Sequence, residues 1–218
     1  MPYVAFPRDT VVLTAPTRDD LRSLAEKQPP SVTIFEYPYD SLKPLAILAG
    51  LEVLKIQDSG ALRTLDGIAA LAGIKNLVIS TPPTWDGTSK KIEVDSFTPL
   101  ETTKSLERLI LMGVRPKDLD LSPIMRMTHL REVDIGGVPE FTIAHYARLS
   151  VALPNAEGRC LQPYFEIKNL AFCKKCKAQQ VLLNGTPPKA RKWVCPKCNQ
   201  KKLAEHVRAW ESFKNTNG

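Results

Sequence analysis

Four of the five cysteines in this 218-residue chain fall into two Cys-x-x-Cys pairs. The first pair is Cys173 and Cys176, and the second is Cys195 and Cys198. A Cys-x-x-Cys turn places two thiolates on one side of a metal ion, and two such turns complete a tetrahedron with Zn–S bonds of about 2.3 Å. The spacing between the two pairs is typical of zinc sites. The sequence therefore predicts one structural Zn²⁺ per chain, bound by all four thiolates.

Paired cysteines also have uses other than zinc binding. Soft sulfur ligands in a closed shell favour structural Zn²⁺, but rubredoxin-type iron shares the same ligand set, and either pair alone could be a redox dithiol. These two alternatives stay open. Haem attachment is excluded because no Cys-x-x-Cys-His occurs. The fifth cysteine, Cys160, has no partner in spacing and is interpreted as a small structural residue.

The elements around the cysteines must position them. Residues 179–183 and 191–194 are predicted strands, joined by a turn that contains Gly185. Residues 168–200 thus resemble a zinc ribbon. Residues 200–215 are predicted to form a terminal helix, with an apolar stripe that docks on its own domain. The stripe consists of Leu203, Val207, Trp210 and Phe213.

Charge divides the chain near the same region. Residues 159–218 contain 13 Lys/Arg and 3 Asp/Glu, a net charge of +10, whereas the preceding residues contain 17 and 20, a net charge of −3. This shift predicts two domains, residues 1–158 and 159–218. Lysines beside the thiolates would offset the −2 charge of a zinc–tetrathiolate centre. Alternatively, the basic segment binds nucleic acid, with Trp193 stacking on a base or packing over the small core. The residues proposed for that alternative are Lys174, Lys175, Arg191, Lys192, Trp193 and Lys197.

A short apolar phrase recurs through the first domain. Leu-Glu-Val-Leu-Lys-Ile at residues 51–56 returns in similar form at residues 74–79, 106–111 and 130–135. Apolar residues occupy its first, fourth and sixth places, and a spacing of Leu-x-x-Leu-x-Leu with a period in the twenties is a repeat signature. Each phrase is predicted to be a short strand whose apolar residues face the core.

Residues 32–161 resemble the leucine-rich repeat family in its short, internalin-like form. The resemblance implies an α/β fold, a leucine-rich-repeat solenoid with an N-terminal cap, followed by the C-terminal zinc ribbon and terminal helix. It also implies that a protein partner binds the concave strand face, where the residues between the leucines lie. The residues expected to contact that partner are Glu52, Lys55, Lys75, Arg108 and Arg131.

Several classes of function are not expected. No phosphate-binding Gly-rich loop, Gly-x-Ser-x-Gly elbow or His-Glu-x-x-His motif occurs, so we expect neither catalysis nor a small-molecule substrate. No run of eighteen apolar residues occurs, so no membrane span is expected. Residues 1–20 do not resemble a secretory signal, and paired cysteines suit a reducing cytoplasm. The sequence thus predicts a non-enzymatic, cytoplasmic protein-interaction protein, with nucleic-acid binding as the alternative.

Overall fold

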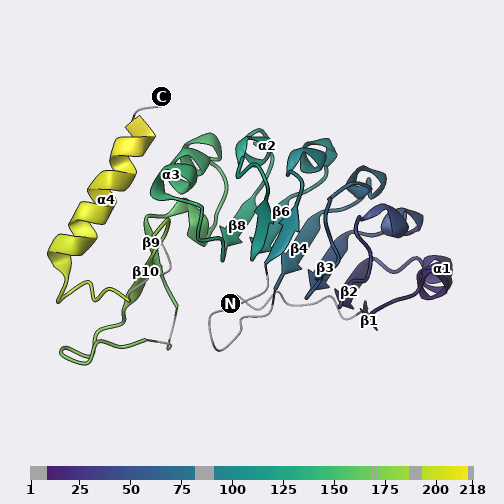
Figure 1. Cartoon of the computed structure of the whole chain (residues 1–218), viewed down its shortest axis with the longest axis horizontal. Helices are drawn as coiled ribbons and strands as arrows, with labels where there is room; N and C mark the ends of the chain where they lie inside the picture. The colour runs from purple at the N-terminus through teal and green to yellow at the C-terminus, as the bar shows by residue number, and fades with distance from the viewer. Residues whose placement is uncertain (1–8, 82–90, 168, 170, 187–192, 216–218) are drawn as a thin grey trace. The chain divides into compact units, whose positions relative to one another are not determined.

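The computed structural model (Figure 1) describes residues 9–81, 91–167, 169, 171–186 and 193–215. The chain forms two compact units, one spanning Tyr3–Val138 and one containing Pro139–Gly218. We call them the sheet unit and the cysteine unit. The charge-based boundary after residue 158 falls inside the cysteine unit. The unit begins earlier because helix α3 (Ile143–Ala152) packs against the terminal helix α4 (Gln200–Asn215).

A six-stranded parallel sheet forms the centre of the sheet unit, in the order β1-β2-β3-β4-β6-β8. Its strands are β1 (Thr10–Thr14), β2 (Ser31–Phe35), β3 (Val53–Gln57), β4 (Asn76–Ser80), β6 (Arg108–Met112) and β8 (Glu132–Gly136). Neighbouring strands pair residue for residue, so Ile34, Ile56 and Ile79 lie in one row across the sheet. All three are fully buried, because alternate side chains of each strand face the same core.

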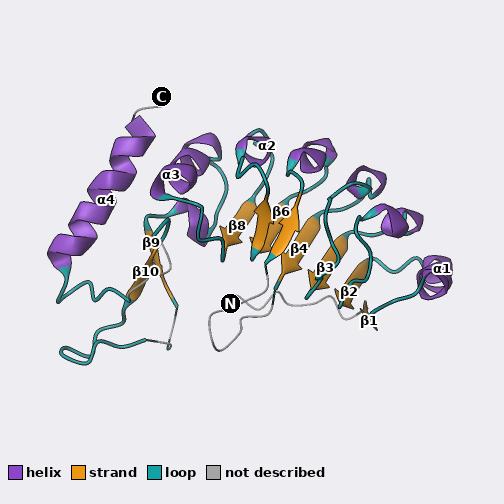
Figure 2. Cartoon of the chain, viewed as in Figure 1, coloured by secondary structure: helices purple, strands orange, loops and turns teal. Residues whose placement is uncertain are grey.

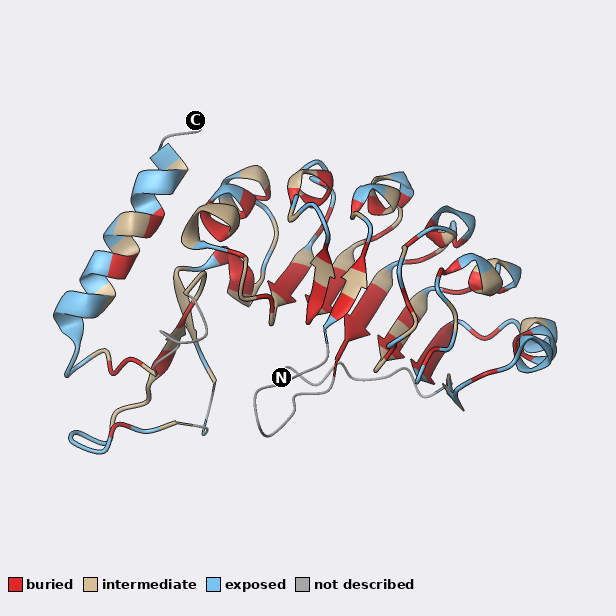
Figure 3. Cartoon of the chain, viewed as in Figure 1, coloured by how far each residue is buried: buried red, intermediate tan, exposed pale blue. Residues whose placement is uncertain are grey.

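The helical connections of the sheet unit lie along one face of the sheet (Figure 2). They are α1 (Arg18–Lys27), the 3-10 helices η1 (Lys43–Ile47), η2 (Ile68–Ala70) and η3 (Thr98–Thr102), and the short helix α2 (Ser122–Met125). A capping box starts α1: Thr17 N donates to Asp20 Oδ2 at 2.8 Å, and Asp20 N donates to Thr17 Oγ1 at 3.2 Å. We call the opposite side of the sheet the open face. Figure 3 shows the buried residues concentrated in the strands.

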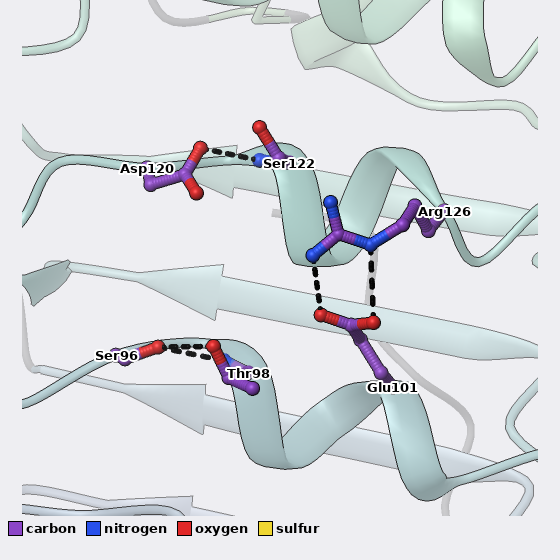
Figure 4. A network of polar contacts seen from close by, with 6 residues as sticks. All are labelled: Ser96, Thr98, Glu101, Asp120, Ser122 and Arg126. Carbon is purple, nitrogen blue, oxygen red and sulfur yellow. Dashed lines mark hydrogen bonds and ion pairs between the residues drawn. The ribbon is translucent and has the colours of Figure 1, made fainter.

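Polar contacts fix two adjacent connections, η3 and α2, beside one another (Figure 4). Arg126, which ends α2, donates from Nη2 to Glu101 Oε1 at 2.6 Å and from Nε to Oε2 at 3.0 Å. The pKa of Glu101 is lowered chiefly because Arg126 donates to its carboxylate. At the helix starts, Ser96 Oγ accepts from Thr98 N, and Asp120 Oδ1 accepts from Ser122 N. These caps satisfy backbone amides that have no partner within a helix.

The prediction of a leucine-rich-repeat solenoid is wrong: the fold is an α/β arrangement built on the parallel sheet. The connections differ in kind, because α1 has ten residues whereas η2 has three. Two further strands, β5 (Ile92–Val94) and β7 (Val114–Pro116), form a second parallel sheet within the connections. The recurring phrase correctly marks strands with a common buried face. That requirement belongs to any sheet covered on one side, so the phrase reports strand burial and does not define the repeat architecture.

The cysteine unit combines helices with a small antiparallel sheet. After α3 come η4 (Arg159–Leu161), β9 (Tyr164–Glu166), β10 (Val181–Leu183) and α4. Strand β10 pairs with β9, and Val181 also forms a bridge with Val194. The predicted terminal helix is confirmed, and Trp210 in its apolar stripe is fully buried. None of the helices in the described part of the chain has the length and apolar character needed to cross a bilayer.

Candidate metal centre

The four paired cysteines converge on one point in the cysteine unit. Their sulfur atoms all lie within 4.8 Å of one another. The Sγ atoms of Cys176 and Cys195 are 3.4 Å apart, and those of Cys173 and Cys198 are 3.8 Å apart. A tetrahedron with Zn–S bonds of about 2.3 Å has S···S edges of about 3.8 Å. The predicted ligand set is therefore assembled with separations that fit a tetrathiolate metal ion.

Backbone geometry brings each pair of thiols to one side. In the first pair, Lys177 N donates to Cys173 O at 2.9 Å, which closes a tight turn around Cys176. In the second pair, Asn199 N donates to Cys195 O at 2.9 Å, and Cys198 N donates to the Cys195 sulfur at 3.4 Å. Amide-to-sulfur bonds stabilise the thiolate form that a metal requires.

The turn after the first pair carries backbone strain. Lys177 has a φ of +60°, in the left-handed region that a side chain disfavours. Asn199, which follows the second pair, does not have a positive φ, because it lies at the start of α4, where its carbonyl accepts from Leu203 N.

The four thiols are coupled electrostatically. Backbone amides of Cys176 and Lys175 lower the pKa of Cys173 to about 6. In contrast, hydrogen bonds with the neighbouring thiols raise the pKa of Cys198. Four thiolates this close repel one another, and a divalent cation removes that repulsion. Metal binding at this cluster therefore releases protons, and its affinity rises with pH.

The apolar core beneath the metal centre is very small. Its buried members are Val181, Leu183 and Val194, and the partly buried Tyr164 and Leu203 pack against them. A core of this size contributes too little burial to fix a module on its own, and such modules usually depend on a metal or disulfides. All five cysteines are free thiols. The residues present thus fit a structural metal ion with a closed set of four protein ligands.

The residues proposed for nucleic-acid contact are only partly placed. Lys174, Lys175 and Lys197 lie exposed beside the metal ligands. Trp193 is half-buried, whereas Arg191 and Lys192 lie outside the described residues. Sequence reasoning missed Phe172, which precedes the first ligand and is 53% exposed. An aromatic residue flanking a Cys-x-x-Cys turn is visible in the sequence, but its exposure is not.

Most of the residues proposed to contact a protein partner form ion pairs with other residues of the sheet unit. Lys75 forms an ion pair with Glu52 at 2.9 Å, and Arg131 lies 3.5 Å from Glu107. Arg108 Nε lies 2.9 Å from Glu132 Oε2 of the neighbouring strand β8 and forms an ion pair with it. Lys55 lies at the middle of β3, and burial lowers its pKa. Arg108 and Glu132 lie in adjacent strands, and the other two pairs join residues that immediately precede adjacent strands. Ion pairing along the sheet therefore engages these charges without a partner.

The remaining candidate residues have structural contacts. Cys160 lies outside the metal cluster and is buried, as its interpretation as a structural residue requires. His206 lies on α4, where its Nε2 is 2.8 Å from the carbonyl oxygen of Pro163 and donates to it. Burial is the main cause that lowers the pKa of His206. Neither residue belongs to the cluster of possible metal ligands found among the described residues.

The buried imidazole of His206 predicts a pH-dependent stability. Its ordinary pKa is 6.5, and its folded-state pKa is lower. The unfolded chain therefore binds the proton more readily, and stability is complete above pH 6.5 and falls as the pH decreases below it. We expect denaturant midpoints of the zinc-loaded protein to fall between pH 7 and pH 5.5. The variant His206→Gln, whose amide can still donate to Pro163, should show a flatter profile. Equal slopes of the denaturant midpoint against pH for the two proteins would contradict this role of His206.

Comparisons with known proteins give no relative: no family model matches the chain, and no curated protein matches it. The class of protein that the structure itself defines is therefore an α/β protein with a candidate four-cysteine metal centre.

Proposed function

We propose that the protein is a non-enzymatic binding protein. In this proposal a structural Zn²⁺ holds the cysteine unit together, and the open face of the parallel sheet binds a protein partner. The observation that carries the zinc part is the convergence of four thiols within 4.8 Å. The four thiols must stay reduced to bind the metal, so the proposal also includes a reducing compartment such as the cytoplasm.

Exposed apolar side chains support the open face as the partner site. Val12 is 59% exposed and Phe35 is 38% exposed. Val12 lies opposite Thr33 in the strand register, so Val12 and Phe35 lie on the same side of neighbouring strands. Lys55 follows Thr33 in the same row on the next strand. Apolar residues with a polar border are typical of protein-binding surfaces, and here they lie on the face that the helical connections leave uncovered.

The three histidines each make a structural hydrogen bond. His129 Nε2 lies 3.1 Å from Thr103 O, and His206 Nε2 lies 2.8 Å from Pro163 O. His145 Nδ1 accepts from Thr142 N at 3.0 Å, within the capping box of α3. Each imidazole therefore uses one of its two ring nitrogens to hold the backbone.

Paired variants on the two faces of the sheet test the proposal. Val12→Asp and Phe35→Asp place charge on the open face, and Ile47→Asp places the same charge on η1 among the helical connections. Ile47 is 47% exposed, so it is a matched control. Tagged proteins, isolated from cells of the source organism, are compared by quantitative mass spectrometry. We expect one or more proteins to be enriched with the unmodified chain and with Ile47→Asp, and lost with the open-face variants. An enriched set that is the same for all four proteins would refute the open face as the binding site.

A further inference from the structure

The cysteine unit has a second surface that the proposed function does not use. Beside the metal ligands lies a hollow of about 340 Å³, lined by Phe172, Lys174, Lys175, Gln180 and Asn199 together with two of the cysteines. Phe172 is the most exposed large apolar side chain in the described part of this unit. Its backbone is held by an antiparallel bridge to Gln179. The hollow thus combines a flat aromatic ring on a fixed backbone with two cations and two amide side chains.

The positive charge around the hollow exceeds what the metal centre needs. Zinc bound by four thiolates has a net charge of −2, and six lysines among the described residues lie within four residues of a ligand. They are Lys174, Lys175, Lys177, Lys197, Lys201 and Lys202. Charge compensation by two lysines leaves four in excess. No Asp or Glu occurs between Glu166 and Glu205, so the sequence provides no local carboxylate to offset the excess.

The placement of these lysines also costs stability. Lys201 and Lys202 lie in the first turn of α4, which has no acidic residue. The positive end of the helix dipole disfavours cations there. Surfaces that serve solubility alone usually intersperse both signs of charge. None of the six lysines has an ion-pair partner among the described residues, and two of them line the hollow with Phe172.

We propose that this hollow binds single-stranded nucleic acid, with a base stacked on Phe172 and adjacent phosphates contacted by Lys174 and Lys175. Unpaired bases expose the flat surfaces that aromatic side chains stack upon, while lysines follow the backbone. The amides of Gln180 and Asn199 can hydrogen-bond to base edges. An acidic protein segment would satisfy the lysines but would leave Phe172 without a stacking partner. This inference goes beyond the proposed function and is independent of the open face of the sheet.

Fluorescence anisotropy tests the inference with the full-length, zinc-loaded protein. The probes are labelled oligo(dT) and oligo(U) of about twelve nucleotides, which covers a typical single-strand site. A duplex of equal length and a labelled poly-glutamate peptide are the comparison ligands. We expect binding of at least one single strand to be about tenfold tighter than binding of either comparison ligand. Equal affinity for the single strands and the duplex or peptide would overturn the proposal, as would no change in anisotropy.

Two variants separate stacking from charge. Phe172→Ala should weaken binding about tenfold, whereas Phe213→Ala, which removes an exposed ring from α4, should not. The double variant Lys174→Gln/Lys175→Gln should reduce the slope of log K against log salt by about 1.4, because each phosphate contact on a single strand contributes about 0.7. Its control is Lys27→Gln/Lys104→Gln, which changes net charge equally at exposed positions of the sheet unit.

The outcomes of these variants decide the proposal. Retention of one zinc per chain in each variant shows that the cysteine unit is still assembled. If Phe172→Ala binds the single strand as tightly as the unmodified protein, Phe172 does not stack on a base, and the proposal fails. Equal losses for the two double variants would show that net charge alone attracts the strand, which would also overturn the assigned site.

Discussion

Removing the metal is expected to unfold the part of the cysteine unit around the four cysteines and to leave the parallel sheet folded. Purified protein should contain about one zinc per chain, and Cys176→Ser should abolish stable zinc binding. The buried apolar cluster beneath the four cysteines contains three residues, so metal binding provides much of the free energy that holds this part of the unit together. In small zinc domains that contribution is about 10–16 kcal/mol at pH 7. The loss is therefore large enough to unfold a domain of ordinary stability.

Amide hydrogen exchange read by mass spectrometry locates the effect. Peptides from β9, β10 and α4 should lose protection in Cys176→Ser and after chelation, whereas peptides from β2 to β6 should keep theirs. Cys160→Ala is the matched control, because Cys160 lies outside the metal cluster. It should keep its zinc and the protection around the cluster. Unchanged protection of α4 in metal-free protein would contradict a structural role of the metal.

Gly67→Ala is expected to destabilise the sheet unit by about 3–5 kcal/mol, through strain and overpacking together. Gly67 precedes η2 with a φ of +98°, in a region that side chains disfavour. A Cβ atom at this position would lie 2.3 Å from Lys43 N and 2.6 Å from Leu42 C. Both contacts are with backbone of the preceding connection. The clash cannot be relieved by moving a flexible side chain.

Gly60→Ala provides the comparison for this substitution. An added Cβ at Gly60 meets no atom within 4 Å, and Gly60 does not have a positive φ. We expect its effect to stay within about 0.5 kcal/mol, as for an ordinary surface substitution. Urea denaturation followed by circular dichroism measures both variants. Similar urea midpoints for Gly67→Ala and the unmodified protein would contradict this prediction. They would show that the backbones before η1 and η2 can move apart without a loss of stability.

The sequence alone determined the features that depend on neighbouring residues or on simple periodicity. The two Cys-x-x-Cys turns specified the ligand set, because the geometry of each pair is local. The apolar stripe within residues 200–215 likewise specified the terminal helix α4. The recurring phrase identified strands and their buried side, since the buried Leu54 and Ile56 alternate with less buried neighbours. The same phrase misled the assignment of architecture, because burial of one strand face does not determine how the strands are connected.

Tertiary structure decided the features that depend on distant segments. The ion pairs of Lys75 with Glu52 and Arg108 with Glu132 follow from strand register. The sequence predicted that these charges contact a partner, but it does not show which residues of successive repeats lie beside one another. Close approach of two backbones gives Gly67 its importance, and only folding brings residue 43 beside it. Exposure of Phe172 likewise depends on which surfaces the rest of the unit covers. Local chemistry thus predicted the metal ligands, whereas the contacts between segments required the folded chain.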